Sequence, residues 1–180
     1  MEKVIIFIIS GKSGVGKDTT ANIIKNYADN NELKCINLQF SFYIKMYAKL
    51  ITNWDGIDEN KPRTLLQDLG NEIREKLNPD FFINRIIYDI KILSKYADII
   101  TISDTRFPNE LDIISKNFKN SYKIRVLRPN YENKLSKSQK NDLTETALDN
   151  YIDYDYVINN DGSLDILKEK IEEIIKATIK

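Results

Sequence analysis

Short apolar segments alternate with longer amphipathic segments along the chain. Residues 4–9 are wholly apolar and rich in β-branched side chains, which is typical of a central parallel strand covered on both faces. Residues 17–30 follow, with apolar side chains at helical spacing. Because this alternation continues to the end of the chain, we expect an α/β fold in three layers, with a parallel sheet between two layers of helices.

The same pattern predicts bounds for the elements. Strands are expected at residues 4–9, 33–40, 98–103, 122–127 and 156–158. Helices are expected at residues 17–30, 42–51, 63–77, 80–96, 110–118, 143–151 and 164–177. Ser41 and Ser163 are the expected N-caps of the second and last helices. No linker or repeat divides the chain, so we expect one domain over residues 1–180, with a polar, lysine-bearing insert at about 128–142.

A glycine-rich segment joins the first strand to the first helix. Its sequence, Gly11-Lys12-Ser13-Gly14-Val15-Gly16-Lys17-Asp18-Thr19, has the spacing of a phosphate-binding loop. Glycines let the backbone turn tightly, so that its N–H groups point at a polyphosphate, and the helix amino terminus adds partial positive charge. The alternative is a flexible turn with an incidental match. We expect nucleotide binding by Gly11, Ser13, Gly14, Val15, Gly16, Lys17, Asp18 and Thr19.

Asp18 departs from the usual form of this loop, which has Ser or Thr at that position to bind magnesium. A carboxylate is also an oxygen ligand for this hard cation, directly or through water. The departure therefore argues against a switch-type GTPase more than against triphosphate binding. Lys17 is expected to reach the β and γ phosphates.

Composition excludes several other classes. Lysine plus arginine and aspartate plus glutamate number 27 each, so neither a nucleic acid polymer nor an anionic membrane is an expected partner. The chain has no histidine, which removes histidine-based acid–base catalysis and histidine metal sites. The single cysteine, Cys35, fits a reducing compartment such as the cytoplasm, or the host cytoplasm if the protein is viral. Residues 4–9 form the longest apolar run, which is too short to span a bilayer.

Polar residues follow other predicted strands, at the sheet edge where parallel α/β proteins bind ligands. Asp104 comes after the strand 98–103 and is a candidate to hold hydrated Mg²⁺; capping the next turn is the alternative. Arg106 has a guanidinium group suited to phosphate, with a surface ion pair to Glu110 as the alternative. Ser41 follows a further strand.

Other candidates lie on helices and in the insert. Arg63 and Gln67 share a helical face, where an arginine can hold an acceptor phosphate and a glutamine can read a base; a solvated face is equally compatible. Lys45 is a weaker substrate candidate, since such lysines often only cover apolar surface. Arg128 begins an insert that resembles a lid able to exclude water, or is part of a disordered polar loop.

Two later residues complete the candidates. Glu145 either contacts a substrate sugar or an arginine, or lies without a ligand in the first turn of a helix. Asn160 belongs to an Asn-Asp-Gly sequence that backs an adenine ring or forms a plain turn.

With these residues in view, the chain resembles the phage-type deoxynucleoside monophosphate kinases of the P-loop nucleoside monophosphate kinase superfamily. Four stretches carry the resemblance: residues 11–19, residues 65–70 (Leu-Leu-Gln-Asp-Leu-Gly), residues 104–110 (Asp-Thr-Arg-Phe-Pro-Asn-Glu), and residues 144–148 (Thr-Glu-Thr-Ala-Leu) running into 156–162. The third stretch is the most discriminating. The family often has Ser-Glu where this chain has Thr144-Glu145, and the insert here is rich in lysine rather than arginine.

The resemblance implies a P-loop NTPase-type fold and transfer of the ATP γ-phosphoryl group to a (deoxy)nucleoside 5′-monophosphate, with Mg²⁺. By position, the phosphate loop holds ATP, while Arg63, Gln67 and Arg106 face the monophosphate and Arg128 serves the lid. A homodimer is also implied, with the apolar face of residues 42–50 as one candidate contact. The alternatives are a phosphomevalonate-kinase-like or dephospho-coenzyme-A-kinase-like enzyme, and a non-catalytic ATP-binding module.

Overall fold

The computed structural model describes residues 3–57, 59–129, 131–133 and 135–179. Its strands are β1 (Ile5–Ser10), β2 (Cys35–Leu38), β3 (Ile99–Thr105), β4 (Ser121–Leu127) and β5 (Tyr156–Asn159). Its helices are α1 (Lys17–Asn30), α2 (Ser41–Thr52), α3 (Arg63–Lys76), α4 (Phe81–Leu93), α5 (Pro108–Asn117), α6 (Lys137–Lys140), α7 (Leu143–Thr146) and α8 (Leu164–Thr178). The predicted alternation of strands and helices is confirmed.

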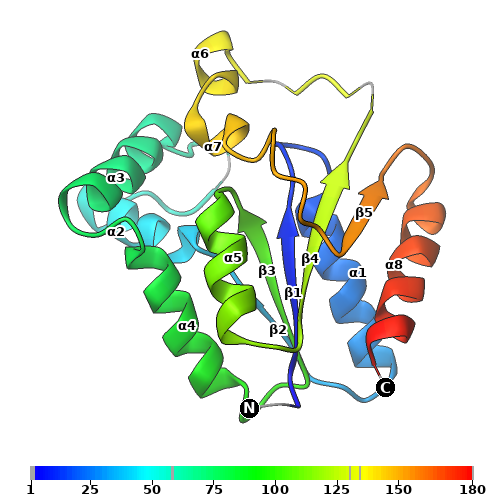
Figure 1. Cartoon of the computed structure of the whole chain (residues 1–180). Helices are drawn as coiled ribbons and strands as arrows, with labels where there is room; N and C mark the ends of the chain where they lie inside the picture. The colour runs from blue at the N-terminus through cyan, green and yellow to red at the C-terminus, as the bar shows by residue number, and fades with distance from the viewer. Residues whose placement is uncertain (1–2, 58, 130, 134, 180) are drawn as a thin grey trace.

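The strands form one parallel sheet in the order β2-β3-β1-β4-β5. β1 lies at its centre, and the six residues of this strand are all buried, as its apolar sequence predicts. Figure 1 shows the sheet nearly edge-on, with α4 and α5 on one side and α1 and α8 on the other. The fold is therefore the predicted three-layer α/β/α arrangement.

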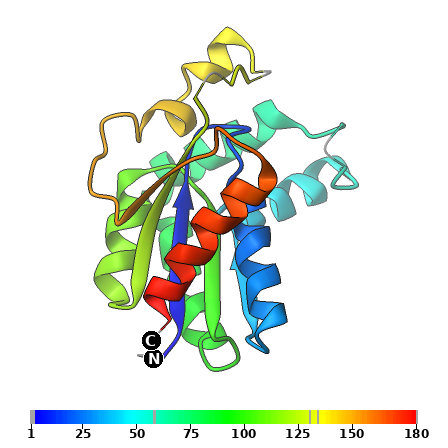
Figure 2. The same ribbon diagram turned by 90° about the vertical axis from the view of Figure 1, so that its right-hand side faces the viewer.

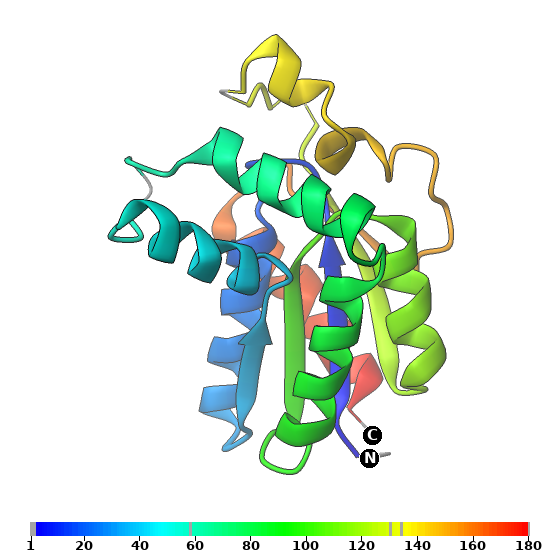
Figure 3. The ribbon, with the colours of Figure 1, turned by 90° about the vertical axis from the view of Figure 1, so that its left-hand side faces the viewer.

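Alternate residues of each strand supply the two halves of the core. On one face Ile6, Ile8, Ile100 and Ile102 pack with Phe82, Ile86, Ile90, Leu111 and Ile114 of α4 and α5. On the other face Ile5, Phe7, Ile9, Ile99 and Val126 pack with Ala21, Ile24, Leu167, Ile171 and Ile175 of α1 and α8. Figure 2 looks onto the α1 and α8 side, and Figure 3 onto the side of α2, α3 and α4. Burial on both faces explains why the central strands are continuous apolar runs.

The loops at the carboxyl ends of the central strands gather at one end of the molecule. β1 leads into the phosphate loop, and the segment between β4 and β5, which carries α6 and α7, passes over the same end (Figure 1). α2 and α3 flank it from the side (Figure 3). The carboxyl ends of the central parallel strands are thus covered by the segments that carry the predicted site residues.

Two predicted boundaries near Asp104 are wrong. β3 continues to Thr105, which pairs with Ser10, so Asp104 lies within the strand rather than after it. β2 ends at Leu38 instead of residue 40, because the backbone N–H of Phe40 donates to the Asp104 carboxylate and leaves the sheet. Ser41 is therefore the first residue of α2 and not its N-cap; Phe40 occupies that position, and its own side chain makes no capping hydrogen bond.

The predicted helix at 143–151 ends at Thr146, and the insert contains the short helix α6, which the sequence pattern did not predict. Ser136 caps α6 with its hydroxyl, which accepts from the backbone N–H of Gln139. Lys134, one of the lysines of the insert, lies outside the described residues. Among the residues that the structure describes, every helix is too short or too polar to cross a lipid bilayer.

Candidate active site

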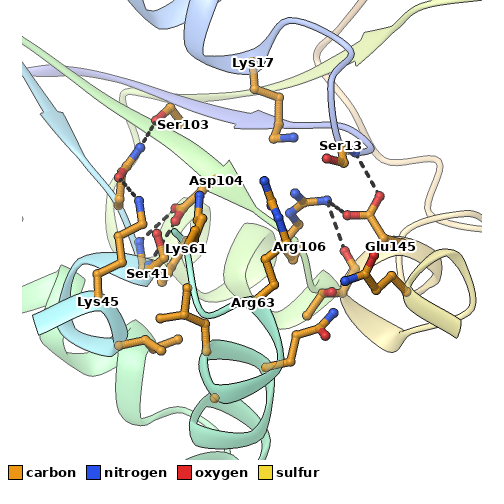
Figure 4. Close-up of a pocket in the computed structure, with 18 of the residues that line it drawn as sticks. Ser13, Lys17, Ser41, Lys45, Lys61, Arg63, Ser103, Asp104, Arg106 and Glu145 are labelled. Carbon is orange, nitrogen blue, oxygen red and sulfur yellow. Dashed lines mark hydrogen bonds and ion pairs between the residues drawn. The ribbon is translucent and has the colours of Figure 1, made fainter. Parts of the chain in front are cut away.

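A cavity of about 470 Å³ lies at the carboxyl ends of β1 and β3. Its walls come from the phosphate loop, α2, α3, the end of β3 and the segment around α6 and α7 (Figure 4). It brings together, from distant parts of the sequence, the predicted site residues Ser13, Gly14, Lys17, Asp18, Ser41, Lys45, Arg63, Gln67, Asp104, Arg106 and Glu145. The sequence prediction of a shared site is supported by this convergence.

The phosphate loop has the tight backbone that its glycines permit. Gly16 has φ of +108°, a left-handed conformation that residues with a Cβ adopt at a cost. A Cβ at Gly16 would also lie 2.6 Å from Nδ2 of Asn160, whose amide donates to the carbonyl of Val15 at 2.9 Å. Asn160 therefore holds the backbone of the phosphate loop. This differs from both roles predicted for it, which were a contact to adenine and a place in a plain turn.

Lys17 is buried at the start of α1, and its ammonium group points into the cavity (Figure 4). Its Nζ donates to the carbonyl of Lys12 at 2.8 Å, across the loop. Desolvation, together with the nearby positive charge of Arg106, lowers the pKa of Lys17 from 10.5 to about 7. An anion bound in the loop would restore the charged form, which is the behaviour expected of a phosphate-binding lysine.

Arg106 lies between the phosphate loop and the rest of the cavity. Its Nη1 donates to Oε1 of Glu145 at 2.7 Å and to the carbonyl oxygens of Gly11 and Thr144, each at 3.3 Å. The other carboxylate oxygen of Glu145 accepts from the backbone N–H of Ser13 at 2.9 Å. Glu145 thus contacts an arginine, one of its two predicted roles, and connects Arg106 to the phosphate loop.

The alternative prediction for Arg106, an ion pair between its side chain and Glu110, is wrong. Oε2 of Glu110 accepts instead from the backbone N–H groups of Arg106 and Phe107, at 2.7 and 3.1 Å, at the start of α5. Desolvation raises the pKa of this buried carboxyl group to about 7, against the lowering effect of those N–H groups and of Arg74. Glu110 fixes the backbone from which Arg106 extends.

Asp104 holds the amino end of α2. Its two carboxylate oxygens accept from the backbone N–H groups of Phe40 and Ser41, at 2.8 and 2.9 Å. The alternative prediction for Asp104 was that it caps the turn directly after it. In the structure Asp104 instead caps α2, which comes earlier in the chain. Because a carboxylate oxygen can accept more than one bond, Asp104 still presents acceptor capacity to the cavity that it lines.

Asp18 and Asp104 are the predicted magnesium ligands, and both line the cavity. Within the described ranges, no group of three or more His, Cys, Asp or Glu side chains could enclose a metal. Two carboxylates fit Mg²⁺ that is held partly by nucleotide phosphates and water, which is how this ion is usually bound in phosphoryl-transfer sites.

Lys45 is held in the cavity by a chain of side chains. Its Nζ donates to Oε1 of Gln39 at 3.0 Å, and Gln39 donates to Oγ of Ser103 at 3.2 Å (Figure 4). Asn37 donates to the same hydroxyl at 3.1 Å. Gln39 and Ser103 were not predicted as site residues; the signal available was their position at the carboxyl ends of two neighbouring parallel strands.

α3 presents one face to the cavity, as the spacing of Arg63 and Gln67 predicts. Arg74, further along the same face, also lines the cavity but was not predicted as a site residue. Its guanidinium lies between two aromatic rings, 5.1 Å from the centroid of Phe82 and 4.5 Å from that of Phe107. Desolvation lowers the pKa of Arg74, while Glu110, 3.8 Å away, opposes this.

Lys61, just before α3, is a second cation of the cavity wall that was not predicted (Figure 4). Several predicted residues lie outside the wall. Gly11 and Val15 are buried within the loop, and Thr19 is exposed on α1. Arg128 is exposed and does not line the cavity.

The fold and this site define a class, the P-loop kinases. Solved structures of P-loop kinases superpose over nearly the whole chain. An APS kinase from Mycobacterium tuberculosis, solved with AMPPNP and APS, has a TM-score of 0.56 at 11% identity, covering 98% of this chain and 99% of that one. Shikimate kinase from Aquifex aeolicus has a TM-score of 0.55 at 10% identity, covering 96% and 97%. At these identities the likeness establishes the fold.

The family is shown by sequence. Residues 28–171 match the family described as deoxynucleotide monophosphate kinase, and the chain belongs to that family. It is accordingly a phosphotransferase that acts on a nucleotide monophosphate, as predicted. The match begins after the phosphate loop, so the loop is evidence separate from the match. No curated protein compared with the chain matches it in sequence.

Proposed function

We propose that the chain transfers the γ-phosphoryl group of ATP, with Mg²⁺, to a deoxynucleoside 5′-monophosphate bound between α2 and α3. The observation that carries this proposal is the position of Arg106. Its guanidinium is bonded to the phosphate loop at Gly11 and also lines the cavity. A cation at that junction can contact a phosphoryl group while it passes from donor to acceptor.

The donor's polyphosphate lies in the phosphate loop in this proposal, with the ammonium group of Lys17 on its β and γ phosphates. Asp18 and Asp104 would hold a hydrated magnesium ion, which would supply neutralisation of phosphate charge. Lys17 and Arg106 stabilise the charge that develops on the transferring group. No strong base is needed, because the attacking oxygen of the acceptor phosphate is already anionic.

The acceptor lies across the cavity in this proposal. Arg63 and Lys45 point into it from α3 and α2 and would hold the monophosphate together with Ser41 (Figure 4). Ile44, Leu66 and Gly70 make an apolar part of the wall, where a base can lie flat, and the amide of Gln67 is beside it. These residues come from two helices that contact each other, so their positions depend on one another.

The insert at 128–142 acts as a lid in this proposal. Leu135 and Gln139 of the insert already line the cavity. Closing this segment over the phosphates would exclude water, the competing nucleophile in a kinase. We further propose a single domain working in the cytoplasm. The exposed apolar side chains of α2, Phe42, Met46 and Leu50, are the candidate contact of a homodimer.

The test is a coupled assay of ADP release by the purified protein with Mg-ATP and each deoxynucleoside monophosphate. Turnover with at least one of them is expected. Mevalonate 5-phosphate and dephospho-coenzyme A are included as rival acceptors, and faster turnover with either would overturn the proposed acceptor class. Replacing Lys17→Met should abolish turnover. The matched control is Lys25→Met, which changes an exposed lysine of the same helix.

A further inference from the structure

The segment after β4 contacts two successive residues of the phosphate loop. The carboxylate of Glu145 accepts from the backbone N–H of Ser13. Beside the next residue, Gly14, lies the aromatic ring of Tyr131, which belongs to the insert. The insert is therefore in contact with the loop itself, and one of its side chains occupies a defined place on it.

Gly14 has no side chain, and the end of the Tyr131 ring lies where a Cβ would be. The φ of Gly14 is +78°, and a Cβ at this position would lie 2.5 Å from Cε1 and 2.6 Å from the hydroxyl oxygen of Tyr131. Both distances are far below van der Waals contact, so a side chain here would push the end of the tyrosine ring away from its present place. Gly14 thus supplies the space that the ring fills, in addition to the backbone freedom that the loop requires.

The ring of Tyr131 also stacks against the guanidinium of an arginine, Arg128. The guanidinium carbon of Arg128 lies 4.6 Å from the centroid of the Tyr131 ring, and the backbone N–H of Tyr131 donates to the carbonyl of Arg128 at 3.3 Å. This is cation–π stacking. Stacking uses the face of a guanidinium and leaves the N–H groups at its edge able to donate to phosphate oxygens.

We propose that Tyr131 is a positioning residue, which holds the guanidinium of Arg128 against the phosphate loop so that it meets the phosphates of the donor nucleotide. The inference rests on the proposed function, in which the donor occupies this loop. It explains how Arg128, exposed and outside the cavity wall, serves transfer. The ring lies beside Gly14, which lines the cavity, and in this proposal it holds the stacked guanidinium on the side of the loop where the donor phosphates bind.

A double-mutant cycle tests this role. Tyr131→Ala and Arg128→Ala should each raise the KM for ATP about tenfold, the effect of weakening one arginine–phosphate contact. The variant with both changes should be no worse than either alone, because both changes remove the same contact. Tyr131→Phe keeps the ring and should stay within about twofold of the parent.

The control is Tyr88→Ala, which removes an exposed tyrosine on α4 and should change neither KM nor kcat. Two results would overturn the positioning role of Tyr131. One is a KM for ATP in the double variant that is raised by the product of the two single effects; the other is a KM for Tyr131→Ala within about twofold of the parent. The dissociation constant of a non-hydrolysable ATP analogue is also measured for the parent, both single variants and the double variant. Absence of turnover in the parent protein then counts against the proposed function alone, while the binding cycle still decides the role of Tyr131.

Discussion

The carboxylate of Glu145 lies 2.7 Å from Nη1 of Arg106, and the side chains of both residues are mostly buried. The other oxygen of the same carboxylate is bonded to the phosphate loop. One negative charge therefore fixes the arginine relative to the backbone that holds the donor phosphates. Since a guanidinium that is already oriented loses less entropy when it meets its substrate, this pair is expected to contribute to the rate.

Glu145→Gln tests that contribution. Glutamine keeps an oxygen for the N–H of Ser13 but loses the charge that faces Arg106, so we expect kcat to fall by about tenfold to a hundredfold. Steady-state kinetics with ATP and the best acceptor measure the effect. Glu72→Gln, which changes an exposed carboxylate on α3, should leave kcat unaltered. An unchanged kcat for Glu145→Gln would show that Arg106 does not depend on this pair.

Arg106→Ala should lower kcat by about two orders of magnitude or more, because charge stabilisation in the transition state is lost. Arg106→Lys should recover part of the rate, since it restores the charge without the planar fork. Arg85→Ala serves as the control, because Arg85 is exposed on α4 and does not line the cavity. A rate for Arg106→Ala within a few-fold of the parent would remove Arg106 from the mechanism.

Binding of nucleotide should take up protons near pH 8. The pKa of Lys17 is about 7 without a ligand, so most of the lysine is neutral at pH 8, and a bound polyphosphate raises this pKa. The affinity for an ATP analogue should accordingly fall as the pH rises from 7 to 9. Calorimetry in buffers of different ionisation enthalpy measures the uptake. Lys17→Met should abolish it, and binding heats independent of the buffer in the parent protein would contradict the prediction.

The same lowered pKa makes Lys17 a destabilising residue at low pH. Below pH 7 the lysine is charged in both the folded and unfolded states and carries its desolvation cost in the folded state. Between pH 7 and 10.5 the unfolded state binds the extra proton, so the cost declines as the pH rises. Lys17→Met should therefore raise the melting temperature more at pH 6 than at pH 9.5. Thermal melts at both values measure this, and an equal shift would refute the lowered pKa.

Arg74→Ala should lower the free energy of unfolding by about 2–4 kcal/mol, because it removes a packed guanidinium and leaves the buried Glu110 without its cationic neighbour. Urea denaturation measures the loss. The control is Arg85→Ala: Arg85 also stacks on one ring, that of Tyr43 at 4.5 Å, but it is exposed. Its loss should cost about 1 kcal/mol or less. Equal losses of unfolding free energy in the two variants would show that the buried position of Arg74 beside Glu110 makes no additional contribution to stability.

The local sequence determined the layers of the fold and one half of the site. Apolar runs alternating with amphipathic segments specified buried parallel strands and covering helices, because each element buries its own periodic face. The phosphate loop was predictable for a similar reason: residues 11–19 are contiguous, and the chemistry of the loop lies mainly in its own backbone. Arg63 and Gln67 were predictable as neighbours, since four residues make about one helical turn.

The tertiary structure alone decided which side chains meet. Glu145 and Ser13 are 132 positions apart, and their contact follows from the path of the chain over the sheet. Asp104 caps a helix that begins 63 positions earlier. Arg74 and Tyr131 gave no sequence signal, because an arginine on an amphipathic helix and a tyrosine in a polar insert are ordinary. Their roles come from the aromatic rings and the glycine that packing places beside them, which no spacing along the chain encodes.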